Sequence, residues 1–171
     1  MLLKSLKTHF PARVTEWLMS GVLFTWGYYV VTHPQIFTNP ETAAIFRGIG
    51  SIAEWFGQPP VTMGIMALLT GFARACALFV NGAVTKTPLV RLLTAFMSAY
   101  LWTSICVGLW LSGVESTGLV VYPWFVIADV ISGYRAGYDL VIAENTAKIT
   151  RAQRNDRDSG TSRFRSLLVG F

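Results

Sequence analysis

The chain has 171 residues, of which 53% are hydrophobic and 13% are charged, and its formal net charge is +5. A soluble globular domain has about a quarter of its residues charged, so this composition excludes an ordinary soluble domain. A mean hydropathy of +0.48 indicates a membrane protein. Four spans of about 20 residues take up nearly half of the length, which leaves no room for a separate soluble catalytic domain.

Four apolar stretches are long enough to cross a bilayer, at residues 14–31, 61–80, 92–114 and 116–138. Because lipid cannot hydrogen-bond the backbone, we expect each of them to be a helix. The sequence therefore predicts an all-α integral membrane protein. A four-helix transmembrane bundle forms a membrane domain over residues 1–138, and residues 139–171 form a basic cytoplasmic tail.

The flanking charges predict the orientation of this bundle, since Lys and Arg in short flanks stay on the cytoplasmic side. Basic residues precede the first span and separate the second from the third: Lys4, Lys7, Arg13, Lys86 and Arg91. The turn after the third span carries only Glu115. A signal peptide is the alternative for the N-terminus, but no small-x-small cleavage pattern follows the first apolar run. We expect an uncleaved anchor, with both termini on the cytoplasmic side of a bacterial inner (plasma) membrane.

An amphipathic helix is predicted between the first two spans, over residues 40–57. Asn39 is suited to its N-cap and Pro40 to its first turn. Apolar residues recur at spacings of four and three on one face: Ile45, Ile49, Ile52 and Phe56. The helix is too polar to span, so we place it flat on the outer membrane surface.

Two ionisable residues lie inside the predicted spans, Arg74 in the second and Asp129 in the fourth. Each costs at least ~2.5 kcal/mol at a helix centre unless it is paired or hydrated. Both lie about 17–20 Å below the outer boundary by the rise of a helix. We expect a buried ion pair; the functional alternative is a proton or ion relay at Asp129.

Small residues repeat every four positions in the last three spans, which lets helix backbones approach closely. The sequence predicts that these ladders line the bundle interior: Ala67, Gly71 and Ala75, then Ser104, Gly108 and Ser112, then Ala128, Ser132 and Ala136.

The tail is basic, and residues 155–162 have the composition of a flexible segment. Basic residues just inside a membrane bind anionic headgroups, and the candidates are Lys148, Arg151, Arg154, Arg163 and Arg165. Four acidic residues offset six basic ones from position 139 onward, so we do not expect nucleic-acid binding.

No catalytic, nucleotide or metal motif stands out. His9 and His33 lie apart without further ligands at metal spacing, and no glycine-rich phosphate loop is present. We expect neither an enzyme nor a bound cofactor or metal.

Three segments carry a resemblance: residues 32–40 (THPQIFTNP), the Asn-Gly turn at 81–82, and residues 117–124 (TGLVVYPW). Over roughly residues 20–140 the chain resembles small multi-pass inner-membrane proteins encoded by tailed bacteriophages and prophages. The resemblance implies a phage origin and an inner-membrane location, and no particular activity.

Three functions therefore remain open. The first is a non-enzymatic membrane platform or accessory factor, which contacts anionic lipid and either further copies of itself or a membrane-protein partner. The second is a holin-like pore-forming lysis protein. The third is a small transporter or channel that uses Arg74 and Asp129.

Overall fold

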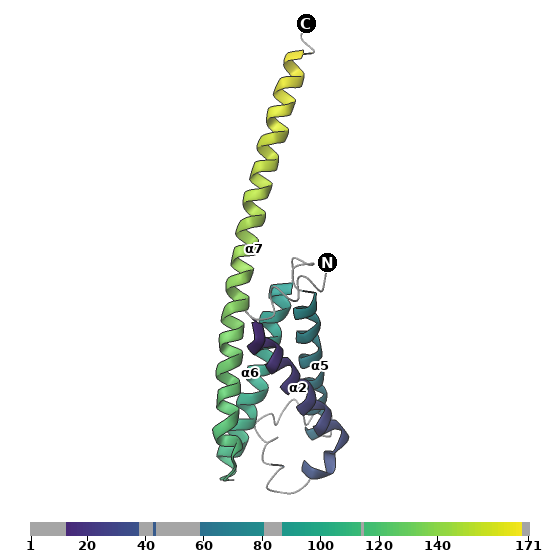
Figure 1. Ribbon diagram of the computed structural model, residues 1–171, viewed down its shortest axis with the longest axis vertical. Coiled ribbons are helices and arrows are strands. Elements are labelled where there is room, and N and C mark those ends of the chain that lie inside the picture. Colours follow the sequence, from purple (N-terminus) through teal and green to yellow (C-terminus); the bar gives the residue numbers. More distant parts are fainter. Residues whose placement is uncertain (1–12, 38–42, 44–58, 81–86, 114, 169–171) are drawn as a thin grey trace. The chain divides into compact units, whose positions relative to one another are not determined.

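The computed structural model describes residues 13–37, 43, 59–80, 87–113 and 115–168, and for residues 36–37 and 156–168 it describes the backbone alone. This part of the chain is all-helical, as predicted, and contains no strand. It consists of α2 (Val14–Thr32), a short 3-10 helix η2 (Pro34–Phe37), α5 (Pro59–Phe79), α6 (Thr87–Leu111) and α7 (Gly118–Leu168). Figure 1 shows these elements in the colours of the sequence.

Three of these helices are long and apolar enough to cross a membrane: α5, α6 and the part of α7 up to residue 155. The 19-residue helix α2 is not among them, because Glu16, Ser20 and three threonines lower its mean hydropathy. The composition of the described helices thus supports three of the four predicted spans. The predicted amphipathic helix over 40–57, with Ile45, Ile49, Ile52 and Phe56, lies outside the described residues except for Ala43.

The chain divides into two compact units, Met1–Gly137 and Tyr138–Phe171, and α7 contributes to both. The helix of the second unit runs on to Leu168, so the predicted flexible segment at 155–162 is helical instead. Residues 139–154 explain why the helix continues after the last apolar stretch. They include many strong helix formers, and Glu144 and Lys148 have the favourable i, i+4 order.

Within the first unit, α2 packs tightly against α5 through glycines. A Cβ atom added at Gly27 would lie 2.5 Å from the backbone nitrogen of Leu68, and one added at Gly71 would lie 2.7 Å from that of Phe24. The two contacts pair the end of α2 with the middle of α5, and the middle of α2 with a later part of α5. The helices are therefore antiparallel, and both glycines permit a backbone approach that no side chain would allow.

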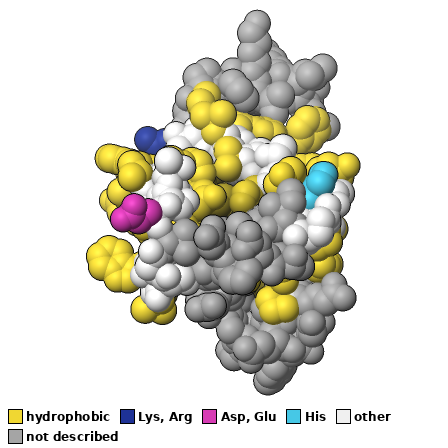
Figure 2. Space-filling view, turned by 90° about the horizontal axis from the view of Figure 1, so that it is seen from below, with side chains coloured by type: hydrophobic (Ala, Val, Ile, Leu, Met, Phe, Trp, Pro, Cys, Tyr) yellow, Lys and Arg dark blue, Asp and Glu magenta, His cyan; other side chains and the backbone are white. Residues whose placement is uncertain are grey.

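The core of the first unit is formed by fully buried apolar side chains of α2, α5 and α6: Met19, Leu23, Val30, Met63, Ala67, Leu101, Trp102, Ile105 and Leu109. Side chains of α7 such as Tyr122 and Phe125 pack against this core. Large apolar side chains also point outward, including Trp110 and Tyr134, each 77% exposed. Figure 2 shows hydrophobic side chains over much of the described surface visible in that view, with few charged ones. Such an exterior suits contact with lipid.

Candidate functional site

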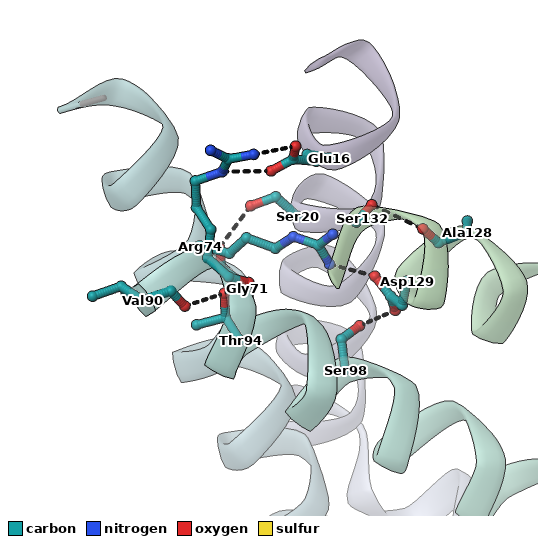
Figure 3. Close-up of polar contacts among 11 residues, drawn as sticks. Glu16, Ser20, Gly71, Arg74, Val90, Thr94, Ser98, Ala128, Asp129 and Ser132 are labelled. Carbon is teal, nitrogen blue, oxygen red and sulfur yellow. Dashed lines mark hydrogen bonds and ion pairs between the residues drawn. The ribbon is translucent and has the colours of Figure 1, made fainter. Parts of the chain in front are cut away.

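A network of buried polar side chains connects the helices of the first unit (Figure 3). Among the described residues, the charged side chains that are buried are Glu16, Arg74, Arg91 and Asp129. Each comes from a different helix. Two negative and two positive charges balance one another inside the bundle.

Arg74 and Asp129, predicted as partners from the sequence, lie in contact. Nη1 of Arg74 donates to one carboxylate oxygen of Asp129, and the Ser98 hydroxyl donates to the other. Arg74 is 0% exposed and Asp129 is 1% exposed. One carboxylate therefore connects α7 to both α5 and α6. The contact between Ser98 and Asp129 was not predicted from the sequence.

A second buried ion pair joins α2 to α6, and the sequence reasoning missed it. Nε of Arg91 donates to Oε2 of Glu16 at 2.8 Å, and Nη2 of Arg91 donates to Oε1 at 2.6 Å. This fork-to-fork geometry is the strong form of an arginine–carboxylate contact. Arg91 was assigned to the hairpin before the third span, but α6 already begins at Thr87. The feature of the sequence that could have revealed this pair is Glu16, an acidic residue inside the first apolar stretch.

The two ion pairs form separate layers of the bundle. Ser98, which contacts Asp129, lies seven residues after Arg91 on α6, a distance of about 10 Å along the helix axis. Between the layers, the Ser20 hydroxyl of α2 donates to the Gly71 carbonyl of α5 at 2.7 Å. The interhelix contacts thus run from α2 to α5, from α5 to α7, from α7 to α6 and from α6 back to α2. They form a closed ring.

The predicted ladders of small residues are mostly buried. Ala67, Gly71, Ser104, Gly108, Ser132 and Ala136 are buried, whereas Ala75, Ser112 and Ala128 are half-buried. The Ser112 hydroxyl, one residue beyond the end of α6, donates to the Gly108 carbonyl, and the Ser132 hydroxyl donates to the Ala128 carbonyl within α7. The sequence reasoning missed Gly27 and Gly64 at the α2–α5 contact.

An aromatic cluster lies one helical turn along α6 from Ser98. Trp102 is 0% exposed and stacks on Tyr122 with ring centroids 5.4 Å apart. Trp26 and Phe125 meet it at steep angles, with centroids at 5.6 and 4.9 Å. Trp102 therefore belongs to the packed core of the first unit.

Some buried donors of this region have no acceptor. Nε and Nη2 of Arg74 make no hydrogen bond, and neither does Nε1 of Trp102. Because buried polar groups are nearly always paired, the arginine atoms mark a specific place in the bundle where an acceptor is needed.

The basic residues of the second unit are described only in part. Lys148, Arg151 and Arg154 are exposed, while the side chains of Arg163 and Arg165 lie outside the described residues. The thiols of Cys76 and Cys106 are free and lie in α5 and α6. Within the described ranges, no three His, Cys, Asp or Glu side chains come together as metal ligands would.

Comparison of the chain with protein-family models, curated proteins and solved structures finds no match. The resemblance to phage-encoded membrane proteins therefore stays a prediction.

Proposed function

We propose that this chain is a four-span membrane protein whose bundle acts as a non-enzymatic platform, with both termini in the cytoplasm of a bacterial, or phage-infected, cell. The observation that carries the proposal is the closed ring of buried polar contacts. Each of its charged side chains is held by a partner on another helix, an arrangement that favours a fixed scaffold.

The packing of α2 supports a fourth span. Its 19 residues extend about 28 Å, close to the hydrocarbon thickness of a bilayer. Gly27 and Ser20 lie about two turns apart on α2, and both contact α5. If α5 crosses the membrane, its antiparallel neighbour has to accompany it. Glu16 is acceptable at that depth because Arg91 neutralises it.

The basic residues of the second unit give the platform a surface for anionic headgroups. Lys148, Arg151 and Arg154 are exposed and recur every three residues, and each basic residue near an anionic surface strengthens binding severalfold. We propose that this segment contacts the cytoplasmic leaflet, and that further copies or a membrane-protein partner assemble on the bundle.

Controlled expression in bacteria tests the platform function against pore formation. The membrane potential and growth are followed at matched membrane levels of this chain and of an unrelated four-span protein. A platform leaves the potential unchanged in both cultures. Abrupt depolarisation with growth arrest, absent from the control culture, would overturn the proposal in favour of a holin-like pore.

Lipid contact is tested separately on the full chain in proteoliposomes, with a spin label at Thr150. We expect the label to lose mobility when the lipid is partly anionic. A triple variant should need about 100-fold more anionic surface for the same loss of mobility; its substitutions are Lys148→Gln, Arg151→Gln and Arg154→Gln. Equal mobility in neutral and anionic lipid would rule out the headgroup contact.

A further inference from the structure

The Arg74 guanidinium has more donors than the protein supplies with acceptors. A guanidinium carries five N–H groups, one on Nε and two on each terminal nitrogen. Nη1 is bonded to Asp129, whereas Nε and Nη2, with three N–H groups between them, make no hydrogen bond. Arg74 is 0% exposed, so bulk solvent does not reach these atoms.

None of the polar groups drawn with Arg74 in Figure 3 accepts a hydrogen bond from Nε or Nη2. The second carboxylate oxygen of Asp129 accepts from Ser98, and the Gly71 carbonyl accepts from Ser20. The Ser132 hydroxyl, drawn beside the pair in Figure 3, donates to the Ala128 carbonyl. An unsatisfied buried donor is destabilising, so an acceptor supplied from outside the chain would stabilise the guanidinium at Nε and Nη2.

The charge of the site limits what that acceptor can be. Arg74 and Asp129 already cancel one another, so a bound anion would introduce an unbalanced charge into the bundle, and a cation cannot accept a hydrogen bond. A small neutral molecule with two lone pairs fits, and buried water typically makes about three hydrogen bonds to such groups.

We infer that Nε and Nη2 of Arg74 form a binding site for ordered water inside the membrane bundle, beside the Asp129 pair. This water completes the hydrogen bonding of a charge that the protein itself satisfies on one side only. The site is distinct from the Glu16–Arg91 pair, where both Nε and Nη2 of the arginine already donate to the carboxylate.

Water contacts at the two arginines can be compared directly by NMR. The full chain is labelled with 15N-arginine and placed in micelles of deuterated detergent. The Nε–H signals of Arg74 and Arg91 are identified by their loss in Arg74→Lys and Arg91→Lys variants. Should either variant fail to fold, the signals are assigned through bonds from the backbone of the unmodified protein.

The expected result is a dipolar cross-peak, opposite in sign to an exchange peak, between water and the Nε–H of Arg74, and none for the equally buried Nε–H of Arg91. No water cross-peak at Arg74 in the folded protein would overturn the inference. Cross-peaks of equal intensity at both arginines would also overturn it, because they would indicate general water penetration of the bundle.

Discussion

Removing either partner of the Arg74–Asp129 pair should destabilise the bundle strongly. Both side chains are at most 1% exposed, so solvent cannot take over the lost contact, and breaking such a pair costs about 3–5 kcal/mol. Asp129→Asn should lie at the upper end, because it leaves an arginine that cannot lose its proton. Arg74→Gln should lie nearer the lower end. The carboxylate it leaves retains the Ser98 hydrogen bond and can take up a proton to become neutral.

Neutralising both partners together should recover much of the loss. We expect the double variant to be less destabilised than the sum of the singles by at least about 2 kcal/mol. Ser98→Ala alone should cost about 1.5–3 kcal/mol, the range for a hydrogen bond to a charged group. The free energy of unfolding is measured by titrating the purified protein from mild detergent into SDS. Glu115→Gln, at an exposed acidic residue outside the helices, is the matched control and should change little.

Two results would refute this reasoning. If both single variants unfold like the unmodified protein, the charges do not interact in the folded bundle. If the double variant loses as much as the sum of the singles, each residue contributes through some other contact.

Two further predictions concern the packing and the second ion pair. Gly27→Ala and Gly71→Ala should each destabilise the protein by about 1–3 kcal/mol in the same SDS titration, because the added methyl group forces α2 and α5 apart. Gly21→Ala is the control and should be neutral or stabilising, because an added Cβ there meets nothing within 4 Å. Equal effects of all three substitutions would contradict the close approach of the two helices. Glu16→Gln should lower the free energy of unfolding by about 3–5 kcal/mol, and adding Arg91→Gln should recover part of this loss. If the double variant loses as much stability as the two single variants combined, the two residues do not form a pair.

The sequence was informative wherever a local pattern determines structure. Apolar stretches predicted the ends of α2 and α5 within two residues and those of α6 within five. The Arg74–Asp129 contact followed from matching depths of opposite charges, a quantity that helix rise supplies. Depths can be matched in this way only for charges that are recognised as lying inside the helices.

What the sequence did not predict depends on tertiary contacts or on helix ends. Arg91 was counted as a loop charge because α6 begins several residues before its apolar stretch, and its partner Glu16 was passed over. The backbone approach at Gly27 is a property of two helices together, and a single-helix pattern of small residues cannot reveal it. The continuation of α7 to Leu168 was missed because a polar composition at 155–162 was interpreted as a break.

Cysteine accessibility in intact cells tests the number and direction of the spans directly. Single cysteines replace Lys7, Glu54 and Arg154 in a background without Cys76 and Cys106, and a membrane-impermeant maleimide is added from outside. Four spans with cytoplasmic termini predict labelling at position 54 alone, with positions 7 and 154 labelled only after the cells are opened. Labelling of positions 7 and 54 together from outside would mean that α2 does not cross the membrane, and labelling of position 154 from outside would contradict the proposed orientation.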